Sequence, residues 1–183
     1  MRFMLCHNNT TQVGGKELLP VWRNNIDSWI WVDLYNEPDD TERTFLASEF
    51  GLDESSINKA QRNRHPPSIE IFKDYIYLLL KPLDEKSDSL DFNTYQLAMF
   101  TAERFLVTRR SKESSYLEKR WQTLEQEGSV GQSPMTLLTA MCHRVADRYG
   151  KILLDLEQRL DVIEDELFDS PTDGLMKELV GYN

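Results

Sequence analysis

The chain has 183 residues, with 21 basic side chains against 31 acidic ones and a formal net charge of −10. This acidity argues against nucleic acid or an anionic lipid surface as the main partner and is compatible with cations. Cys6 and Cys142 lie far apart without CxxC spacing, so neither a disulfide framework nor a zinc knuckle is indicated, and a cytosolic setting fits best.

The longest unbroken apolar run, from Tyr75 to Leu80, spans six residues, whereas a membrane-spanning helix needs about 20. The start of the chain also lacks the basic head and apolar run of a secretory signal. We therefore expect the chain itself to be soluble. Near its end, Leu175, Met176 and Leu179 have helical spacing without a stop signal, which predicts a fragment of a longer protein.

The first third of the chain predicts strands followed by a helix. β-Branched and aromatic residues favour a short strand from Phe3 to Cys6 and a well-buried one from Trp29 to Leu34. A helix with Asp39 and Glu42 as its capping box is expected to end at Gly51.

A second short helix, from Asp53 to Ala60, leads into the most informative stretch, which reads RNRHPPSIEIFKDYIYLLLKPL from Arg62 to Leu83. Proline has no N–H to give a sheet, so Pro66 and Pro67 mark the entry of this run. The apolar residues behind them predict a central strand system with one charged pair in its middle.

After a polar, acidic loop, two strands are expected from Phe92 to Phe100 and from Arg104 to Arg109, joined as an antiparallel hairpin. A helix follows from Ser114 to Gln126. The chain up to this point predicts an α/β or α+β layer structure with a strand-rich core.

The last third predicts one long helix. It begins at the N-cap and first-turn pair Ser133 and Pro134 and ends at Pro171. An apolar stripe runs along it at Leu138, Met141, Val145, Tyr149, Ile152, Leu156, Leu160, Ile163 and Leu167. So narrow a stripe favours a partner helix, and a second helix after Asp173 would form an antiparallel pair with the first.

No nucleotide-binding, serine-hydrolase or zinc-protease motif occurs, so we predict that the chain is not an enzyme. The adjacent pairs Cys6 with His7 and Cys142 with His143 are poor zinc chelates, because neighbouring side chains on a strand or a helix point apart.

Carboxylates crowd the C-terminal half of the long helix, which is the wrong end for the helix dipole. They are Asp155, Glu157, Asp161, Glu164, Asp165, Glu166 and Asp169. Such a surface would attract hard cations such as Mg²⁺ where copies from several subunits face one space. The alternative is a solvated face that Lys151 and Arg159 partly relieve.

Four segments, taken in order, resemble the cytoplasmic N-terminal domain of the CorA family of divalent-cation transporters, which comprises magnesium and cobalt channels and their zinc-transporting relatives. They are WVDL at Trp31 to Leu34, LASEFGLDESSI at Leu46 to Ile57, HPPSIEIFKDYIYLLLKPL from His65, and RLDVIEDELFDSP at Arg159 to Pro171. Their order and spacing match the family across about 140 residues.

The resemblance implies an α/β/α domain with a mixed sheet over residues 1–130. The long helix, a turn at Pro171 and the truncated start of an antiparallel stalk helix would occupy residues 131–183. It also implies a homo-pentamer whose two membrane spans lie in an absent C-terminal part, with this chain at the cytoplasmic face of the membrane. The transported and regulatory ion would be Mg²⁺ or Co²⁺, with zinc as the alternative, and no organic cofactor is implied.

The chain departs from the family at one place. In magnesium-transporting members, an acidic pair on the short helix before the proline turn binds regulatory Mg²⁺ between subunits, whereas here the positions read Asn58 and Lys59. An ammonium group cannot ligate a cation, so we expect that site to be missing or rebuilt. Asp147 matches an acidic position lining the same interface and is the one metal ligand that the resemblance carries over.

Transport regulated by cations that neutralise carboxylates between subunits is the first hypothesis for function. A soluble scaffold that oligomerises through a coiled coil of the long helix is the alternative from another class. A metal-dependent hydrolase would need a clustered set of His and Asp ligands, which the sequence lacks.

Overall fold

The computed structural model describes residues 1–62, 65–85, 87 and 92–169. The chain divides into two compact units. The first joins Met1–Pro82 to Tyr95–Cys142 and contains the sheet, and the second joins Leu83–Thr94 to the chain from His143 onward.

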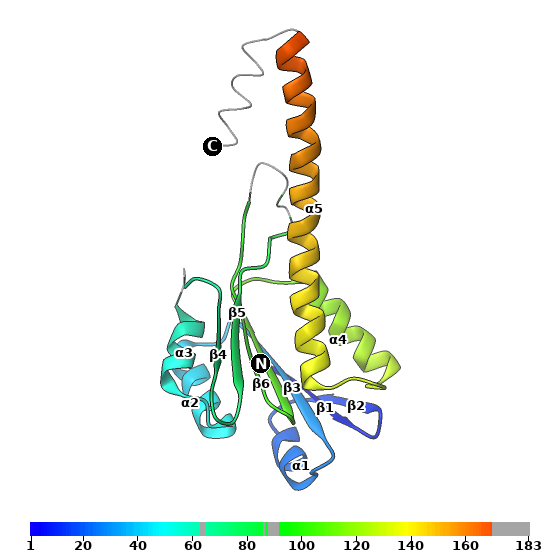
Figure 1. The fold of residues 1–183 in the computed structure, drawn as a ribbon. Helices are drawn as coiled ribbons and strands as arrows, with labels where there is room; N and C mark the ends of the chain where they lie inside the picture. Colours follow the sequence, from blue (N-terminus) through cyan, green and yellow to red (C-terminus); the bar gives the residue numbers. More distant parts are fainter. Residues whose placement is uncertain (63–64, 86, 88–91, 170–183) are drawn as a thin grey trace. The chain divides into compact units, whose positions relative to one another are not determined.

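The first unit is built on a seven-stranded sheet with the order β2-β1-β3-β7-β6-β5-β4 (Figure 1). Its strands are β1 Arg2–His7, β2 Thr10–Gly14, β3 Trp29–Tyr35, β4 Ser68–Ile71, β5 Ile76–Leu80, β6 Leu97–Thr101 and β7 Phe105–Arg110. Strands β3 and β7 run parallel and every other neighbouring pair is antiparallel. The sheet is therefore mixed.

Helices cover both faces of this sheet, as the alternation of side chains along each strand requires. In β3, Ile30 and Val32 belong to one hydrophobic core, while Trp31 belongs to the other. The first core takes in α1 Leu18–Asn24, α2 Asp39–Phe50 and α3 Glu54–Gln61. The second takes in α4 Ser115–Glu127 and the first turns of α5 Pro134–Asp169. The predicted α/β fold with α/β/α layers is confirmed.

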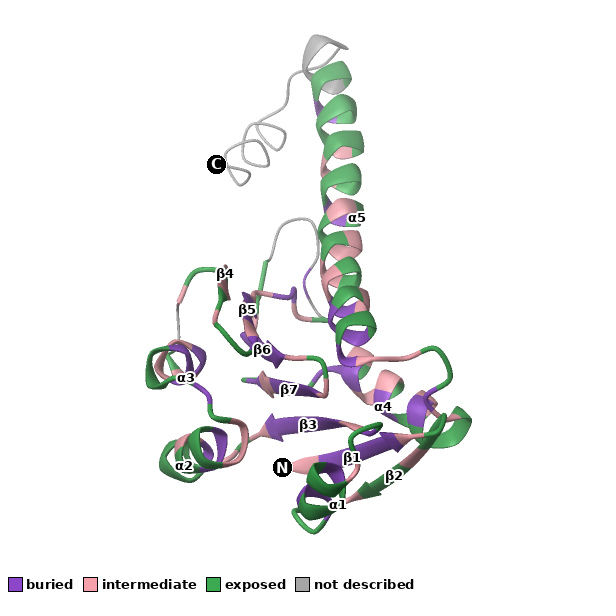
Figure 2. Cartoon of the chain, turned by 60° about the horizontal axis from the view of Figure 1, so that its bottom comes forward, coloured by how far each residue is buried: buried purple, intermediate pink, exposed green. Residues whose placement is uncertain are grey.

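The stretch expected to form a central strand system forms the last two strands of the sheet, the interior strand β5 and the edge strand β4. The 72–75 turn, closed by a bond from the Phe72 N–H to the Tyr75 carbonyl, splits the run into the hairpin β4 and β5. Ile69 and Ile71 on β4 are 65% and 83% exposed, and Figure 2 draws β4 largely green and pink. The strands are confirmed, but the central position was wrong for β4, because apolar content favours strand formation without determining a strand's position in the sheet.

The predicted capping box of α2 was also wrong. Asp39 is the first helical residue, Pro38 is the N-cap, and no side chain caps the helix. Glu42 is buried and accepts a bond from Arg109. Gly51 does end the helix as predicted, in the left-handed conformation with φ of 63°.

The other predicted helices are confirmed with small shifts of their ends. Asp53 caps α3 by accepting from the Ser55 N–H at 2.8 Å, and Ser114 caps α4. Ser133 accepts from the Thr136 N–H at 3.1 Å at the start of α5. The second helix expected after Asp173 lies outside the described residues.

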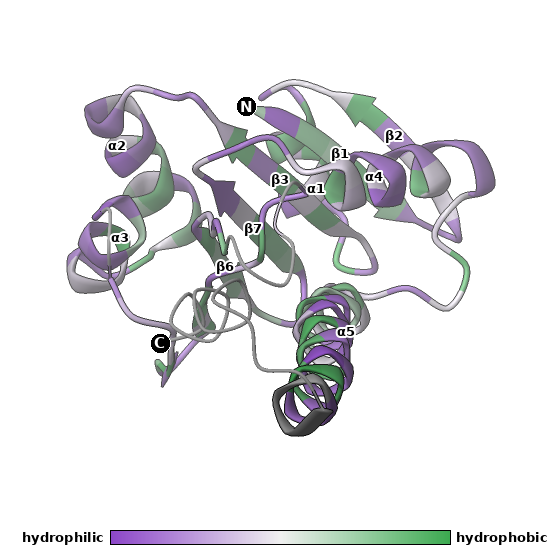
Figure 3. Ribbon diagram, turned by 90° about the horizontal axis from the view of Figure 1, so that it is seen from above, coloured by the Kyte–Doolittle hydropathy of each residue, from purple (hydrophilic) through white to green (hydrophobic). Residues whose placement is uncertain are grey.

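The hairpin predicted between residues 92 and 109 is confirmed as β6 and β7, although β6 begins at Leu97. Strand β2 and helix α1 were not predicted. Helix α5 has 36 residues, and the coloured part of its ribbon in Figure 3 alternates between hydrophobic and hydrophilic residues. Across the described ranges, no helix is both long enough and apolar enough to cross a bilayer.

Candidate functional site

The charged residue of the WVDL segment is part of a buried network. Asp33 Oδ2 lies 2.9 Å from the guanidinium of Arg2 and 3.1 Å from that of Arg110. Asp33 Oδ1 accepts from the Thr108 hydroxyl at 2.7 Å. The Asp33 carboxylate is thus bound by three side chains from the two neighbouring strands, β1 and β7. These contacts explain the buried acidic residue of this segment by structure and not by ligand binding.

Helix α4 completes this network. Glu118 accepts from Arg2 Nη1 at 2.7 Å and from Arg110 Nη2 at 2.8 Å. The Arg2 guanidinium also lies over the ring of Trp121, 4.2 Å from its centroid. Because buried charges are stable only when they are paired and hydrogen-bonded, this network holds α4 against β1, β3 and β7.

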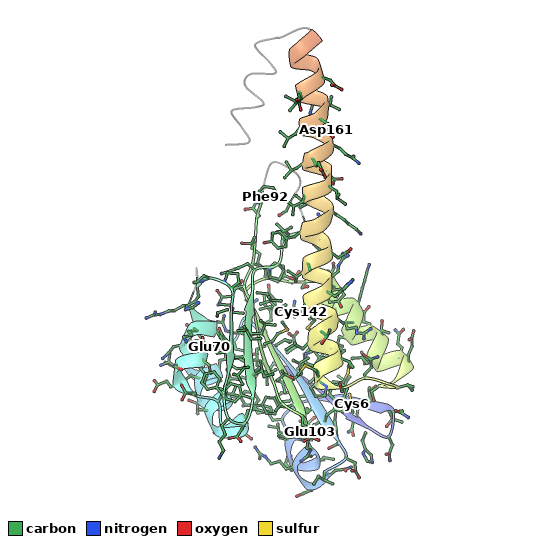
Figure 4. The ribbon with its side chains drawn as sticks, viewed as in Figure 1. Cys6, Glu70, Phe92, Glu103, Cys142 and Asp161 are labelled. Carbon is green, nitrogen blue, oxygen red and sulfur yellow. The ribbon has the colours of Figure 1, made fainter. Side chains whose placement is uncertain are left out.

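The position of the sequence departure, Lys59, forms an ion pair inside the chain. Lys59 Nζ donates to both carboxylate oxygens of Glu70, each at 2.7 Å. Both side chains are 31% exposed. Figure 4 labels Glu70 on β4, the edge strand beside α3. The ammonium therefore neutralises a carboxylate of its own subunit.

Side chains from Gln96 and from Arg109 on β7 bind the end of α3 that carries Lys59. Gln96 Nε2 donates to the carbonyls of Lys59 and Ala60 at 3.3 and 2.6 Å. Arg109 Nη1 donates to the Ala60 carbonyl at 2.8 Å. These bonds satisfy carbonyls that a helix end leaves without intrahelical partners, and they fix the backbone from which Lys59 reaches Glu70.

Arg109 also connects this region to α2. Its Nε donates to Glu42 Oε1 at 2.6 Å, and Glu42 is 2% exposed. Burial raises the pKa of Glu42 above its ordinary value, and the charge of Arg109 counteracts only part of that rise. The polar groups around α3 therefore form a structural cluster with one strongly buried carboxyl.

Asp147, the metal ligand carried over from the resemblance, lies on α5 in the second unit. Its carboxylate is 3.4 Å from Lys151 Nζ and 3.6 Å from Arg144 Nη1, one turn away on either side. Its side chain is 39% exposed. Two cations of the same helix thus already share its charge, and a role in metal binding remains a prediction.

The described residues contain no group of three or more His, Cys, Asp or Glu side chains arranged to hold a metal. Burial raises the pKa of the Cys6 thiol to about 12, so Cys6 remains a protonated core residue. On α5 the carboxylates from Asp155 to Asp165 are exposed, and Figure 4 labels Asp161 among them. A metal site that uses them would need ligands from another chain.

Two contacts near these sites were not predicted from the sequence. Glu70 lies between Ile69 and Ile71 on β4, so its side chain points to the opposite face of the strand from theirs. This alternation could have identified Glu70 as a partner for a lysine or arginine on a helix. In the second unit, Arg148 on α5 donates to the Ser87 carbonyl at 2.9 Å. No local pattern signals that bond, because its partners are 61 positions apart.

Comparison with known proteins identifies relatives of the whole arrangement. The family model described as CorA-like Mg²⁺ transporter protein matches residues 27–183. The cobalt/magnesium transport protein CorA of Methanocaldococcus jannaschii is 26% identical over 156 residues, which are 83% of this chain and 48% of that protein. The chain thus spans about half the length of this curated relative.

Solved structures share the fold. The complete CorA magnesium transporter of the same archaeon superimposes with a TM-score of 0.69 at 19% identity, covering 99% of this chain and 55% of that one. The full-length CmaX protein gives 0.73 at 14% identity, with 99% and 58% covered. The cytoplasmic domain of ZntB from Vibrio parahaemolyticus gives 0.65 at 15% identity, with 99% and 69% covered. With its family model matched over residues 27–183, the chain belongs to the CorA-like Mg²⁺ transporter family.

Proposed function

We propose that this chain is the cytoplasmic domain of a transporter that passes Mg²⁺, with Co²⁺ as a second substrate, across a membrane. The family match over residues 27–183 carries the proposal. The curated relative is named for cobalt and magnesium transport, which supports the same two ions. The predicted absence of enzymatic activity agrees with a family described as transporters.

In this proposal the membrane-crossing part belongs to a C-terminal portion of the full-length protein that these residues do not include. Five copies would assemble around one ion path, so that equivalent helices face each other. Sizing of the full-length protein in detergent by light scattering tests the assembly. A monomeric or dimeric mass would contradict it.

Regulation would operate through carboxylates, with Asp147 as the proposed contact. A divalent cation bound where subunits meet would offset repulsion between carboxylates and favour one closed arrangement. Arg144 and Lys151 limit what one Asp147 can bind, so the remaining oxygen ligands would come from a neighbouring copy.

Uptake of radioactive cobalt by cells that express the full-length protein, with Mg²⁺ and Zn²⁺ as competitors, tests the transported ion. Competition by Mg²⁺ is the expected result, and stronger competition by Zn²⁺ would place the protein in the zinc-transporting branch. Absence of uptake by a correctly assembled protein would favour the alternative of an oligomeric scaffold.

Protease protection of the full-length protein by Mg²⁺ tests Asp147. We expect Asp147→Asn to weaken the protection, and Asp155→Asn, an exposed carboxylate on the same helix, to retain it. Equal protection in both variants would remove Asp147 from the regulatory contact.

A further inference from the structure

At the contact between α3 and β4, a lysine of the same chain binds the carboxylate that a cation could otherwise occupy. Lys59 Nζ lies 2.7 Å from each oxygen of Glu70. A divalent cation could reach this carboxylate only by displacing an ammonium that belongs to the same chain. Because both groups belong to one chain, the carboxylate has its ammonium partner close by at any protein concentration.

The position of Lys59 is restricted as well as its charge. Gln96 and Arg109 bind the carbonyls of the last turn of α3, so the helix cannot easily carry Lys59 away from β4. Register pairing of Glu70 with Tyr77 holds the other partner in the sheet. Both ends of the ion pair therefore start from anchored backbone, which lowers the entropic cost of forming it.

The remaining groups near Glu70 do not fit a hard cation. Tyr77 is fully buried, and its hydroxyl has no hydrogen-bond partner among the residues that the structure describes. Burial, together with the charge of Glu70, raises the pKa of Tyr77. It is therefore a neutral phenol, and the described residues provide no cluster of acidic ligands here. Mg²⁺ prefers near-octahedral oxygen ligation and gives up its water reluctantly, so a single carboxylate already bound by lysine is a poor site.

We propose that the Lys59–Glu70 ion pair is a built-in latch that holds the end of α3 on the edge strand β4 and makes this contact indifferent to divalent cations. The inference rests on the proposed function, because it concerns how such a transporter is regulated. According to this proposal, any response of the protein to divalent cations arises at other carboxylates. The contact between α3 and β4 keeps one arrangement at every cation concentration.

Hydrogen–deuterium exchange of the full-length protein tests the latch, with peptides covering residues 54–80 as the local readout. Exchange is compared in MgCl₂ and in NaCl of the same ionic strength, which separates binding from screening. For the wild type we expect the same exchange in both salts. Slower exchange of this segment in MgCl₂ would overturn the proposal.

Three variants test whether the Lys59–Glu70 ion pair is the reason that the α3–β4 contact does not respond to divalent cations. Lys59→Gln removes the ammonium without adding a second carboxylate, and we expect faster exchange that is equal in both salts. Lys59→Asp places a second carboxylate beside Glu70, and we expect exchange that MgCl₂ slows. The double variant Lys59→Glu with Glu70→Lys restores the pair in reverse and should behave like the wild type.

The proposal fails if Lys59→Gln exchanges as slowly as the wild type, or if Lys59→Asp shows no response to MgCl₂. Should a Lys59 variant fail to fold, Glu70→Gln breaks the pair from the strand side and should give the same faster, salt-independent exchange.

Cobalt uptake separates this inference from the proposed function. Loss of the expected uptake with an intact exchange pattern refutes transport alone, and normal uptake with Mg²⁺-dependent exchange of the wild-type segment refutes the latch alone.

Discussion

Asp33 on β3 and Arg110 on β7 form an ion pair across the parallel strands of the sheet, with side chains only 1% and 5% exposed and an N to O distance of 3.1 Å. Removing one partner of such a pair leaves an uncompensated buried charge. We expect Asp33→Ala to lower the free energy of unfolding by about 3–5 kcal/mol, as measured by urea denaturation of residues 1–183. Asp27→Asn, at an exposed position, is the control and should change it by less than about 0.5 kcal/mol. A similar small effect of Asp33→Ala would show that the network contributes little to stability.

Glu118 should stabilise the fold only above acidic pH. Burial alone would raise its pKa, but the hydrogen bonds and charges of Arg2 and Arg110 together outweigh burial and lower the pKa below the ordinary 4.5. A carboxyl with a lowered pKa in the folded state contributes stability above its unfolded pKa and loses it as the pH falls through the folded pKa. Glu118→Gln should therefore be less stable than the wild type at neutral pH, and the two urea midpoints should converge as the pH falls below 4.5. A difference that stays constant with pH would contradict this assignment.

Glu42 should show the opposite dependence. Its pKa is raised by burial from the ordinary 4.5, so the folded state retains a proton that the unfolded state has lost. Its favourable contribution is complete below the unfolded pKa and is lost as the pH rises through the folded one. As the pH rises from 4.5 towards neutrality, the wild type should lose stability relative to Glu42→Gln. Denaturation curves of both proteins across this range measure the effect, and parallel curves would show that Arg109 keeps Glu42 ionised throughout.

Two glycines should respond in opposite directions to alanine. Gly128 has φ of +82°, and a Cβ there would lie 2.3 Å from the Asn9 carbonyl oxygen, so Gly128→Ala requires the backbone to move. We expect Gly128→Ala to lower the free energy of unfolding by about 1–3 kcal/mol. Gly150 lies within α5, where a Cβ would meet no atom within 4 Å apart from the neighbouring backbone of the helix itself. Gly150→Ala should therefore stabilise the helix by up to about 1 kcal/mol. Thermal unfolding monitored by circular dichroism distinguishes the two, and equal melting temperatures would contradict both expectations.

Local sequence patterns were sufficient for most helices. Asp53, Ser114 and Ser133 provide the cap bonds that their residue types predict, and Gly51 adopts the left-handed conformation that ends α2. These features depend on groups within a few residues of each other. For the same reason, the period of the apolar stripe predicted α5 over nearly its full length.

Partners distant in sequence decided the rest. Asp39 and Glu42 have the spacing of a capping box, but Glu42 binds Arg109, which is 67 positions away. The apolar run after Pro67 predicts strands, yet only the pairing of β5 with β6 leaves β4 at the edge. Hydrogen-bond pairing between strands is set by the whole sheet, and a single strand's composition does not contain that information.

The same division holds for the candidate site. The sequence by itself determined that the short helix before the proline turn carries Asn58 and Lys59 where an acidic pair would suit a cation. Only the tertiary structure supplied Glu70, because β4 folds back beside α3 and brings a carboxylate to within 2.7 Å of the ammonium. An absent ligand can be read from residue types alone. The group that takes its place is known only when the sheet and the helix are brought together, since an ion pair depends on distance in space and not on separation along the chain.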